Sequence, residues 1–226
     1  MFEVSVIVCS YNDSHFLKTC LPSCVKQDLD LEVVVIDDGS AQFDAAILAM
    51  INGHENMRYL RHGKNLGLSE SRNTGIAVAR SEYVIPLDAD DWFYPNTVKG
   101  LFDSREDFDI VTGNCTDNGV YRPAISREPL SEALFLRENP LVCSSLFKKS
   151  IWARVGGYSL RKGYEDYRFW AQCFAQGARF KYVDLNVYEH TSRPDGMLRQ
   201  LHPEREYYHR MATEGVFTCT KPSNAG

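Results

Sequence analysis

Residues 65–92 read NLGLSESRNTGIAVARSEYVIPLDADDW, and this stretch decides the fold. Turn residues open it, and Ser69 is the predicted N-cap of a helix over residues 70–79. Residues 83–87 are a short apolar run of strand length, and Pro86 suits the last residues of a strand because proline cannot donate a ladder hydrogen bond. The stretch therefore predicts a helix that leads into a buried strand.

Three aspartates, Asp88, Asp90 and Asp91, follow that strand at once. If the chain is still extended there, Asp88 and Asp90 project from the same side. Two carboxylates held ~4 Å apart repel by about 1 kcal/mol in water and by several times more near a protein surface, so we expect a cation beside them. Carboxylate oxygens suit Mg²⁺ or Mn²⁺, which commonly bridge carboxylates to substrate phosphates. The alternative is an acidic, solvated loop that caps the helix starting near Asn96.

Two earlier strands end in similar polar clusters. Residues 3–9 (EVSVIVC) form a continuous run rich in β-branched residues, and residues 32–36 (EVVVI) form a second, and both are typical of strands covered on both faces in a parallel sheet. Polar clusters at residues 10–13, 37–40 and 88–91 each follow the carboxyl end of a predicted strand. Ligands of open α/β sheets bind at that end, so we expect the three clusters to converge on one crevice.

The rest of the chain alternates helices and strands. Before the central stretch we predict a helix over residues 14–27 that Pro22 kinks or splits, a helix over 43–51 and a strand over 57–60. After it we predict strands at 109–112, 144–147 and 180–183, a turn-rich or hairpin region at 113–125, and helices at 130–137, 150–155, 163–176 and 202–213, the last with Pro203 at its first position. The fold class is α/β, with a Rossmann-like, mainly parallel sheet flanked by helices and a smaller mixed C-terminal portion.

Length and composition are those of an ordinary globular chain. The 226 residues suit one sizeable α/β core, and the net charge of −5 gives no electrostatic reason to expect nucleic-acid binding. Seven cysteines without a C-x-x-C pair argue against a disulfide framework and a structural zinc site; Cys20 and Cys24 are expected to be buried on one helix face. No run approaches the ~20 apolar residues of a membrane span, and no signal peptide is evident, so we expect a cytoplasmic protein.

Four segments together resemble a known family. SVIVCSYND at residues 5–13, VVVIDDGS at 33–40, the central stretch, and VGGYS at 155–159 followed by GYEDYRFW at 163–170 resemble the family 2 glycosyltransferases, which have the GT-A fold. The resemblance covers roughly residues 4–175. It implies sugar transfer from a nucleoside-diphosphate donor, a UDP-sugar being favoured, with inversion at the anomeric carbon and a divalent metal, Mn²⁺ or Mg²⁺. It also implies one domain over residues 1–217, with a nucleotide-binding half (1–112), an acceptor and catalytic-base half (113–217) and a tail (218–226).

Positions that match the family's donor site follow from this resemblance. Tyr11 would stack on the nucleobase, Asp38 would accept a hydrogen bond from a uracil-type N3–H with support from Asp37, and Asp88 would bind the ribose. The alternative for Asp37 and Asp38 is a pair of N-capping residues for the helix over 43–51. The full set of expected donor-binding residues is Ser10, Tyr11, Asp37, Asp38, Lys64, Arg72, Asp88, Ala89 and Gly157.

The resemblance also assigns the catalytic and metal-binding positions. Glu165 and Asp166 match the family's ED motif, with Asp166 as the base that deprotonates the acceptor hydroxyl; the alternative is a pair of first-turn acids on a surface helix. Asp90 and Asp91 are expected to hold the metal. His190 either joins them or is an ordinary surface histidine.

Other residues keep two interpretations. Gly156 and Gly157 either let the backbone approach the donor sugar or form the C-cap and turn of the preceding helix. Trp92 either lines the acceptor pocket or belongs to the core. The acceptor would be a hydroxyl of a glycan, a lipid-linked sugar, a protein or a modified nucleic-acid base. The alternatives to this enzyme are a sugar-nucleotide-binding relative without activity and a nucleotidyltransferase.

Overall fold

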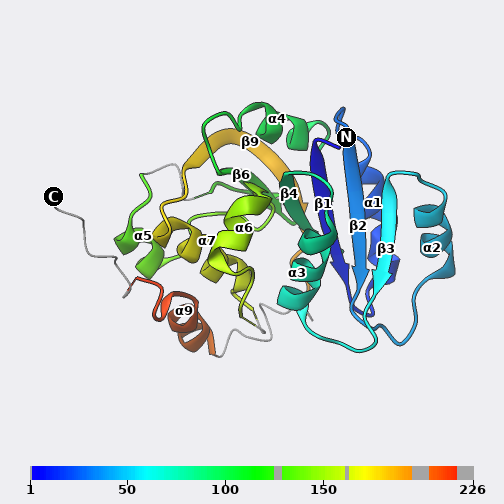
Figure 1. Cartoon of the computed structure of the whole chain (residues 1–226). Coiled ribbons are helices and arrows are strands. Elements are labelled where there is room, and N and C mark those ends of the chain that lie inside the picture. Colours follow the sequence, from blue (N-terminus) through cyan, green and yellow to red (C-terminus); the bar gives the residue numbers. More distant parts are fainter. Residues whose placement is uncertain (1, 125–128, 161–162, 195–203, 218–226) are drawn as a thin grey trace.

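Two mainly apolar segments, β1 (Val4–Ser10) and β2 (Leu31–Asp37), lie in the parallel half of the sheet, and every residue in both is buried (Figure 1). They pair in parallel with Ser10 opposite Asp37, and β4 (Tyr83–Asp88) pairs with the other side of β1 with Asp88 opposite Cys9. This computed structural model describes residues 2–124, 129–160, 163–194 and 204–217. Because β1, β2 and β4 are parallel neighbours, the polar clusters at residues 10–13, 37–40 and 88–91 all follow the carboxyl end of the sheet, and their predicted convergence is confirmed.

Among the described residues, nine strands form one sheet in the order β3-β2-β1-β4-β8-β6-β9-β5, with β7 paired to β6 beside this path. The strands from β3 to β4 are parallel, β8 is antiparallel to both β4 and β6, and β6 is parallel to β9. The junction between the parallel half and the mixed half consists of two residue pairs between β4 and β8, Tyr83 with Lys148 and Val84 with Phe147. The remaining strands are β3 (Met57–Arg61), β5 (Trp92–Phe93), β6 (Ile110–Asp117), β7 (Val120–Arg122), β8 (Leu146–Lys148) and β9 (Phe180–His190).

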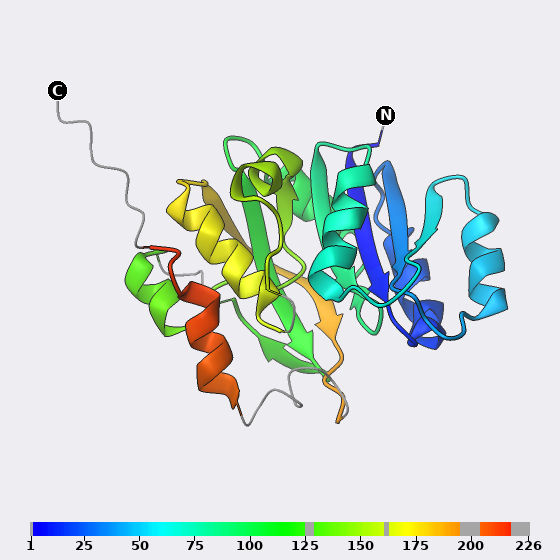
Figure 2. The ribbon, with the colours of Figure 1, turned by 60° about the horizontal axis from the view of Figure 1, so that its bottom comes forward.

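Helices cover both faces of the sheet, because alternate strand residues point to opposite sides. Val6 and Val8 belong to one apolar cluster with α1 (Leu17–Cys24), α2 (Ala45–Asn52) and α4 (Thr97–Asp103). Ile7 belongs to the other, with α3 (Leu68–Val78), α6 (Lys149–Val155) and α7 (Glu165–Ala175). Figure 2 shows α9 (Arg205–Thr213) alongside α7, with α5 (Glu132–Arg137) next to them. The predicted α/β architecture is confirmed.

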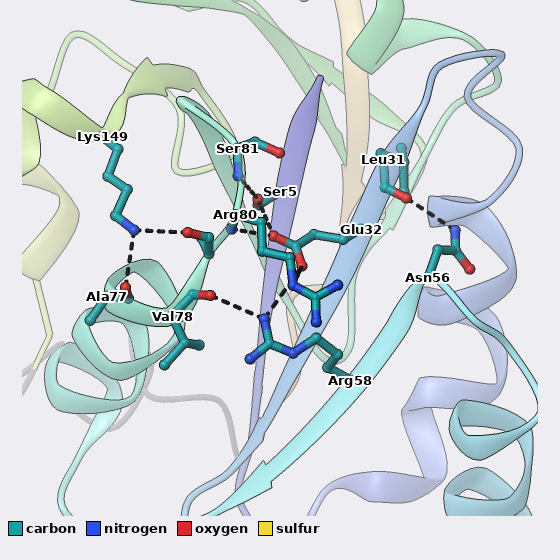
Figure 3. Close-up of polar contacts among 11 residues, drawn as sticks. Ser5, Leu31, Glu32, Asn56, Arg58, Ala77, Val78, Arg80, Ser81 and Lys149 are labelled. Atoms are coloured by element: carbon teal, nitrogen blue, oxygen red, sulfur yellow. Dashed lines mark hydrogen bonds and ion pairs between the residues drawn. The ribbon is translucent and has the colours of Figure 1, made fainter. Parts of the chain in front are cut away.

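A polar network holds the end of the sheet at which β1 and β2 begin (Figure 3). The Glu32 carboxylate is fully buried and accepts hydrogen bonds from the Ser5 hydroxyl at 2.7 Å and from the Arg80 N–H. Arg58 lies 3.5 Å from the same carboxylate and also donates to the Val78 carbonyl. Lys149 donates to two further carbonyls at the end of α3, so cations satisfy the last carbonyls of this helix and hold it against the sheet.

Two predictions about helix ends are wrong. Gly67, with φ of 95°, is the N-cap of α3, whereas Ser69 lies inside the helix and donates its hydroxyl to the Leu160 carbonyl. The predicted helix over residues 14–27 is a 3₁₀ turn, η1 (Ser14–Phe16), followed by α1. Pro22 does not divide it, because it lies two residues before the end of α1, where few backbone bonds depend on it.

Strands β6 and β9 are longer than predicted. Both were expected to be four residues long, at 109–112 and 180–183, yet they extend to Asp117 and His190 and pair with each other through two register shifts. Polar residues in them are accommodated by cross-strand hydrogen bonds, such as Asn114 Nδ2 to Asp184 Oδ1 at 3.0 Å. The predicted hairpin at residues 113–125 is confirmed as the pairing of β6 with β7.

The cysteines in the described ranges are free, and Cys20 and Cys24 are buried on α1 as predicted. Pro203 and the tail at 218–226 lie outside the described residues. None of the helices in the described parts of the chain has the length and apolar content needed to cross a bilayer.

Candidate active site

The acidic turn, residues 88–91, leaves the carboxyl end of β4. The chain turns after Asp88, and the Asp91 N–H donates to the Asp88 carbonyl over 3.0 Å, so the extended chain that would alternate Asp88 and Asp90 is not formed. Thr191, just after β9, holds the turn: its N–H donates to Asp91 Oδ1 at 2.8 Å and its hydroxyl donates to the Asp90 carbonyl at 2.7 Å. The acids do not cap α4, since Asp91 is buried against Thr191 and the N-cap Asn96 makes no side-chain capping bond.

Negative charge accumulates in this turn. Burial raises the pKa of Asp90, and the neighbouring charge of Asp88 raises it further. Burial, Asp88 and Asp90 together raise the pKa of Asp91 well above its ordinary value. Burial and the neighbouring carboxylates both disfavour the ionised forms of these groups, so a cation that bound here would favour ionisation and reduce their mutual repulsion.

Arg72 connects the acidic turn to the ED motif. Its side chain is 1% exposed, and its guanidinium donates to Asp88 Oδ1 at 2.7 Å and to Glu165 Oε1 at 2.6 Å. It also lies 3.1 Å from the Cys143 sulfur and 5.4 Å from the centre of the Tyr158 ring. The guanidinium predicted to meet the donor is thus occupied by two carboxylates, and its placement indicates that it positions Asp88 and Glu165.

Asp166 opens α7 beside this bridge. Its Oδ2 accepts a hydrogen bond from Asn139 Nδ2 at 3.0 Å. Burial raises the pKa of Asp166 to about 6, the negative charge of Glu165 contributes to the rise, and Arg72 opposes it. Glu165 is buried and ion-paired, so it is not a first-turn acid of a surface helix. A half-buried carboxyl with a pKa near neutrality is suited to accept a proton.

Asp37 and Asp38 lie at the carboxyl end of β2, and both are buried. Asp37 accepts from the Ser40 N–H at 2.9 Å and the Tyr59 hydroxyl at 2.7 Å, and it is paired with Arg61. Neither aspartate caps α2, because the Asp44 side chain accepts the N–H bonds of Ala46 and Ile47.

The Asp38 carboxylate is already well supplied with donors from the protein. Its Oδ1 accepts the Leu66 N–H at 2.9 Å and lies 2.7 Å from His62 Nδ1, and its Oδ2 accepts the Gly67 N–H at 2.8 Å. These bonds hold the turn that precedes α3. Because Oδ2 accepts one of these bonds and an oxygen of this kind can take two, the predicted bond from a uracil N–H remains a prediction.

The other predicted donor residues differ in exposure. Ser10 is buried at the end of β1, and its hydroxyl has no hydrogen-bond partner among the described residues. Tyr11, the next residue, is 46% exposed and Lys64 is exposed, whereas Ala89 is buried. An unpaired buried hydroxyl beside an exposed aromatic ring is consistent with a place for a planar, polar ligand.

The glycine pair follows α6. Gly156, with φ of 81°, is the C-cap of this helix, as one of the two interpretations predicted. At Gly157, φ is 78° and an added Cβ would lie 2.6 Å from Asn73 Oδ1. Asn73 itself accepts bonds from Trp152 Nε1 and the Tyr158 N–H, both at 2.9 Å, so the close approach at Gly157 is to this side chain of α3.

The acidic turn fits a divalent cation through one or two carboxylates. Side chains of Asp88 and Asp90 are 33% and 21% exposed, and Mg²⁺ commonly uses one or two carboxylates together with substrate phosphates. Within the described residues, no group of three or more His, Cys, Asp and Glu side chains is arranged to hold a metal. His190 Nδ1 lies 3.5 Å from Asp117 Oδ1, so its recorded partner is on β6 and its metal role stays a prediction.

Several residues of this site carry no local signal in the sequence. Three such residues contact members of the site that lie 27 to 101 positions away in the sequence: Asn139, Cys143 and Thr191. Trp92, in β5, is partly buried and pairs with Glu189 of β9. A role of Trp92 in the acceptor pocket stays a prediction.

Comparisons with known proteins identify the family. The model of Glycosyl transferase family 2 matches residues 5–162. Chondroitin synthase of Escherichia coli is 25% identical over 229 residues, which cover 94% of this chain and 32% of the synthase. The chain spans about a third of the length of several curated relatives.

Two solved structures have the same fold. S. aureus TarS 1-349 in complex with UDP-GlcNAc gives a TM-score of 0.76 at 22% identity. The match covers 93% of this chain and 65% of the TarS chain. The mannosyltransferase PcManGT from Pyrobaculum calidifontis, in complex with GDP-Man and Mn²⁺, gives a TM-score of 0.72 at 20% identity. The match covers 93% of this chain and 63% of the PcManGT chain. The fold is therefore that of the GT-A glycosyltransferases. With the family model matching well over half of its length, the chain belongs to glycosyl transferase family 2.

Proposed function

We propose that the chain is an inverting glycosyltransferase that moves a sugar from a UDP-sugar to an acceptor hydroxyl by single displacement. The observation that carries the proposal is the Arg72 bridge. It joins Asp88, at the carboxyl end of β4, to Glu165, whose neighbour Asp166 has a pKa near 6. The bridge supports the proposal because a buried guanidinium links Asp88, proposed to bind the donor, to the start of the helix that carries the proposed base.

The nucleotide would lie along the ends of β1, β2 and β4. Tyr11 offers an exposed ring for stacking on the base, and the unpaired Ser10 hydroxyl and the remaining capacity of Asp38 offer polar contacts. TarS was solved with UDP-GlcNAc and PcManGT with GDP-Man, so relatives of this fold accept different bases. We favour a uridine nucleotide because a carboxylate accepts the N3–H of uracil.

A divalent cation, Mn²⁺ or Mg²⁺, would be held by Asp90 with help from Asp88 or Asp91. Its chemistry would be to stabilise the negative charge that develops on the departing nucleoside diphosphate. The raised pKa values of Asp90 and Asp91 support this assignment, because burial and the neighbouring carboxylates disfavour their ionised forms, which a bound divalent cation would favour. PcManGT was solved with Mn²⁺.

Asp166 would act as the base. It takes the proton of the acceptor hydroxyl, the acceptor oxygen forms a bond to the anomeric carbon, and the bond from that carbon to the donor phosphate breaks, with its electron pair leaving on the diphosphate. Asn139 donates to Asp166 Oδ2 and orients the carboxylate, and Arg72 limits the rise of its pKa. A base with a pKa of about 6 is mostly ionised at pH 7 and still accepts a proton readily.

Donor hydrolysis tests this function without knowledge of the acceptor, because water can replace the acceptor hydroxyl. The protein would be incubated with Mn²⁺ and UDP-glucose, UDP-galactose, UDP-N-acetylglucosamine or GDP-mannose, and the released nucleoside diphosphate and the anomer of the free sugar would be measured. We expect a uridine donor to be cleaved best and the first sugar released to have the inverted configuration. Release that is strongest with GDP-mannose would remove the uracil assignment, and a retained anomer would remove the single displacement.

Asp166→Asn should bind the donor as the wild type does and lose at least a hundredfold in release, since general base catalysis contributes about 10²–10⁴-fold. Asp103→Asn is the matched control, because Asp103 is an exposed acid of α4 paired with Lys99. Equal loss in the two variants, or undiminished release by Asp166→Asn, would show that the base is another group.

A further inference from the structure

Arg193 joins two parts of the site that are far apart in the sequence. Its Nε lies 2.8 Å from Asp90 Oδ2, and its Nη2 lies 3.2 Å from Asp13 Oδ2, in the loop after β1. The guanidinium carbon is 4.6 Å from the centre of the Phe16 ring, and the side chain is 19% exposed. A partly desolvated guanidinium held between two carboxylates and an aromatic face is a well-fixed cation.

The chain around Arg193 is fixed at the acidic turn as well. Thr191 donates from its N–H to Asp91 and from its hydroxyl to the Asp90 carbonyl. Two residues later, Arg193 returns to the Asp90 carboxylate. The segment after β9 therefore holds the backbone and the side chain of the same acidic residue through separate contacts.

The Asp90 carboxylate already has a cation of the protein beside it, because Arg193 Nε lies 2.8 Å from its Oδ2. A hard divalent cation that uses Asp90 meets the same oxygen that the guanidinium contacts. The carboxylate has enough acceptor sites for both cations, but a divalent cation on Asp90 would lie beside the guanidinium. The two positive charges repel at this distance, so binding of one weakens the contact of the other.

We propose that Arg193 is an internal competitor for the metal site: it pairs with Asp90 until a divalent cation takes that carboxylate, and then keeps its contacts with Asp13 and Phe16. The inference rests on the metal role of Asp90 in the proposed function. It predicts that the side chain of Arg193 lowers the affinity of the protein for a divalent cation in the absence of nucleotide. A purely structural role for the ion pair predicts no such effect.

Binding of Mn²⁺ alone tests the proposal, with no donor and no turnover. Titration of the full chain would be followed by the electron paramagnetic resonance signal of free Mn²⁺. We expect Arg193→Gln to bind Mn²⁺ about fivefold more tightly than the wild type, the factor for loss of ~1 kcal/mol of pairing. Arg193→Lys keeps a cation next to Asp90 and should stay within about twofold of the wild type.

A matched control separates contact from general charge. Arg122→Gln removes one positive charge from β7, where Arg122 is 61% exposed and 3.8 Å from Asp117, and it should leave Mn²⁺ affinity unchanged. Adding Asp90→Asn to Arg193→Gln should abolish the gain in Mn²⁺ affinity, because the carboxylate for which the two cations compete is then absent. Thermal unfolding of each variant establishes that it is folded.

The outcomes distinguish the competition by Arg193 from the metal role of Asp90. If the wild type and Arg193→Gln bind Mn²⁺ equally, or if Arg122→Gln gives the same gain, the competition is refuted while the metal role of Asp90 stands. If no variant binds Mn²⁺ in the absence of nucleotide, the competition is refuted. If Asp90→Asn binds Mn²⁺ as the wild type does, the metal role of Asp90 is refuted, and the competition with it.

Discussion

Replacement of Asp166 by Asn is expected to stabilise the fold while it removes transfer. A rise of the Asp166 pKa from 3.8 to about 6 means that folding disfavours the ionised carboxyl. At ~1.36 kcal/mol for each pKa unit, the cost at pH 7 is about 3 kcal/mol as an upper bound, because solvent reaches the half-buried side chain. Asn carries no charge and can still pair with Asn139, so the variant should be more stable by up to this amount.

The direction of this pKa shift determines how the stabilisation of the variant changes with pH. Below pH 3.8 the carboxyl is protonated in both the folded and the unfolded chain, and the cost is absent. The cost grows between pH 3.8 and about 6 and is complete above that range. It is therefore about 1 kcal/mol at pH 4.5, so the gain in the variant should shrink by about 2 kcal/mol between pH 7 and pH 4.5.

Urea unfolding at the two pH values measures this difference. With a slope of ~3 kcal/mol per molar urea, a gain of about 3 kcal/mol moves the midpoint by ~1 M at pH 7. The comparison of wild type and variant at each pH cancels the titration of the other groups. Either a variant less stable than the wild type at pH 7, or a gain of equal size at both pH values, would refute the reasoning.

Further predictions concern the bridge, the glycine turn, the cap of α2 and the rate. Arg72→Met should lower the free energy of unfolding by about 3–5 kcal/mol, because Glu165 keeps a buried charge without its cation; a loss below ~1 kcal/mol in urea would contradict the bridge. Gly157→Ala should cost about 1–3 kcal/mol, from its φ of 78° and the contact with Asn73, and an unchanged unfolding temperature would contradict this. Asp44→Ala should cost about 1 kcal/mol through loss of the cap, measured in the same way, with no change expected if Asp44 is not the cap. Donor release should fall tenfold for each pH unit below about 6, as the base takes up a proton; a constant rate from pH 5 to 7 would assign the base elsewhere.

The parallel half of the fold follows from short-range patterns. The apolar runs that became β1, β2 and β4 have little polar content, and their acids come directly after them, so the position of the site could be predicted. Asp44 shows the limit of such reasoning: the sequence offered Asp37 and Asp38 as possible caps, and the residue that caps α2 lies six or seven positions further on.

The partners within the site depend on long-range packing. Arg72 and Glu165 are 93 positions apart, and nothing local indicates that the guanidinium is buried between Glu165 and Asp88. The length of β9 was missed for a related reason, because Asp184 interrupts the apolar run and is compensated by Asn114 on the neighbouring strand. Polar groups satisfied across the sheet cannot be recognised from their own segment.

The short junction between β4 and β8 limits the strand pairing that joins the two halves of the protein. A chimaera that replaces the mixed half must rebuild two residue pairs at this junction and the two pairs between β5 and β9. The incoming half must provide a carboxylate at the place of Glu165, since Arg72 would otherwise be buried with one partner. If the chain has the proposed function, we expect such a recombinant to take its donor preference from one parent and its acceptor preference from the other.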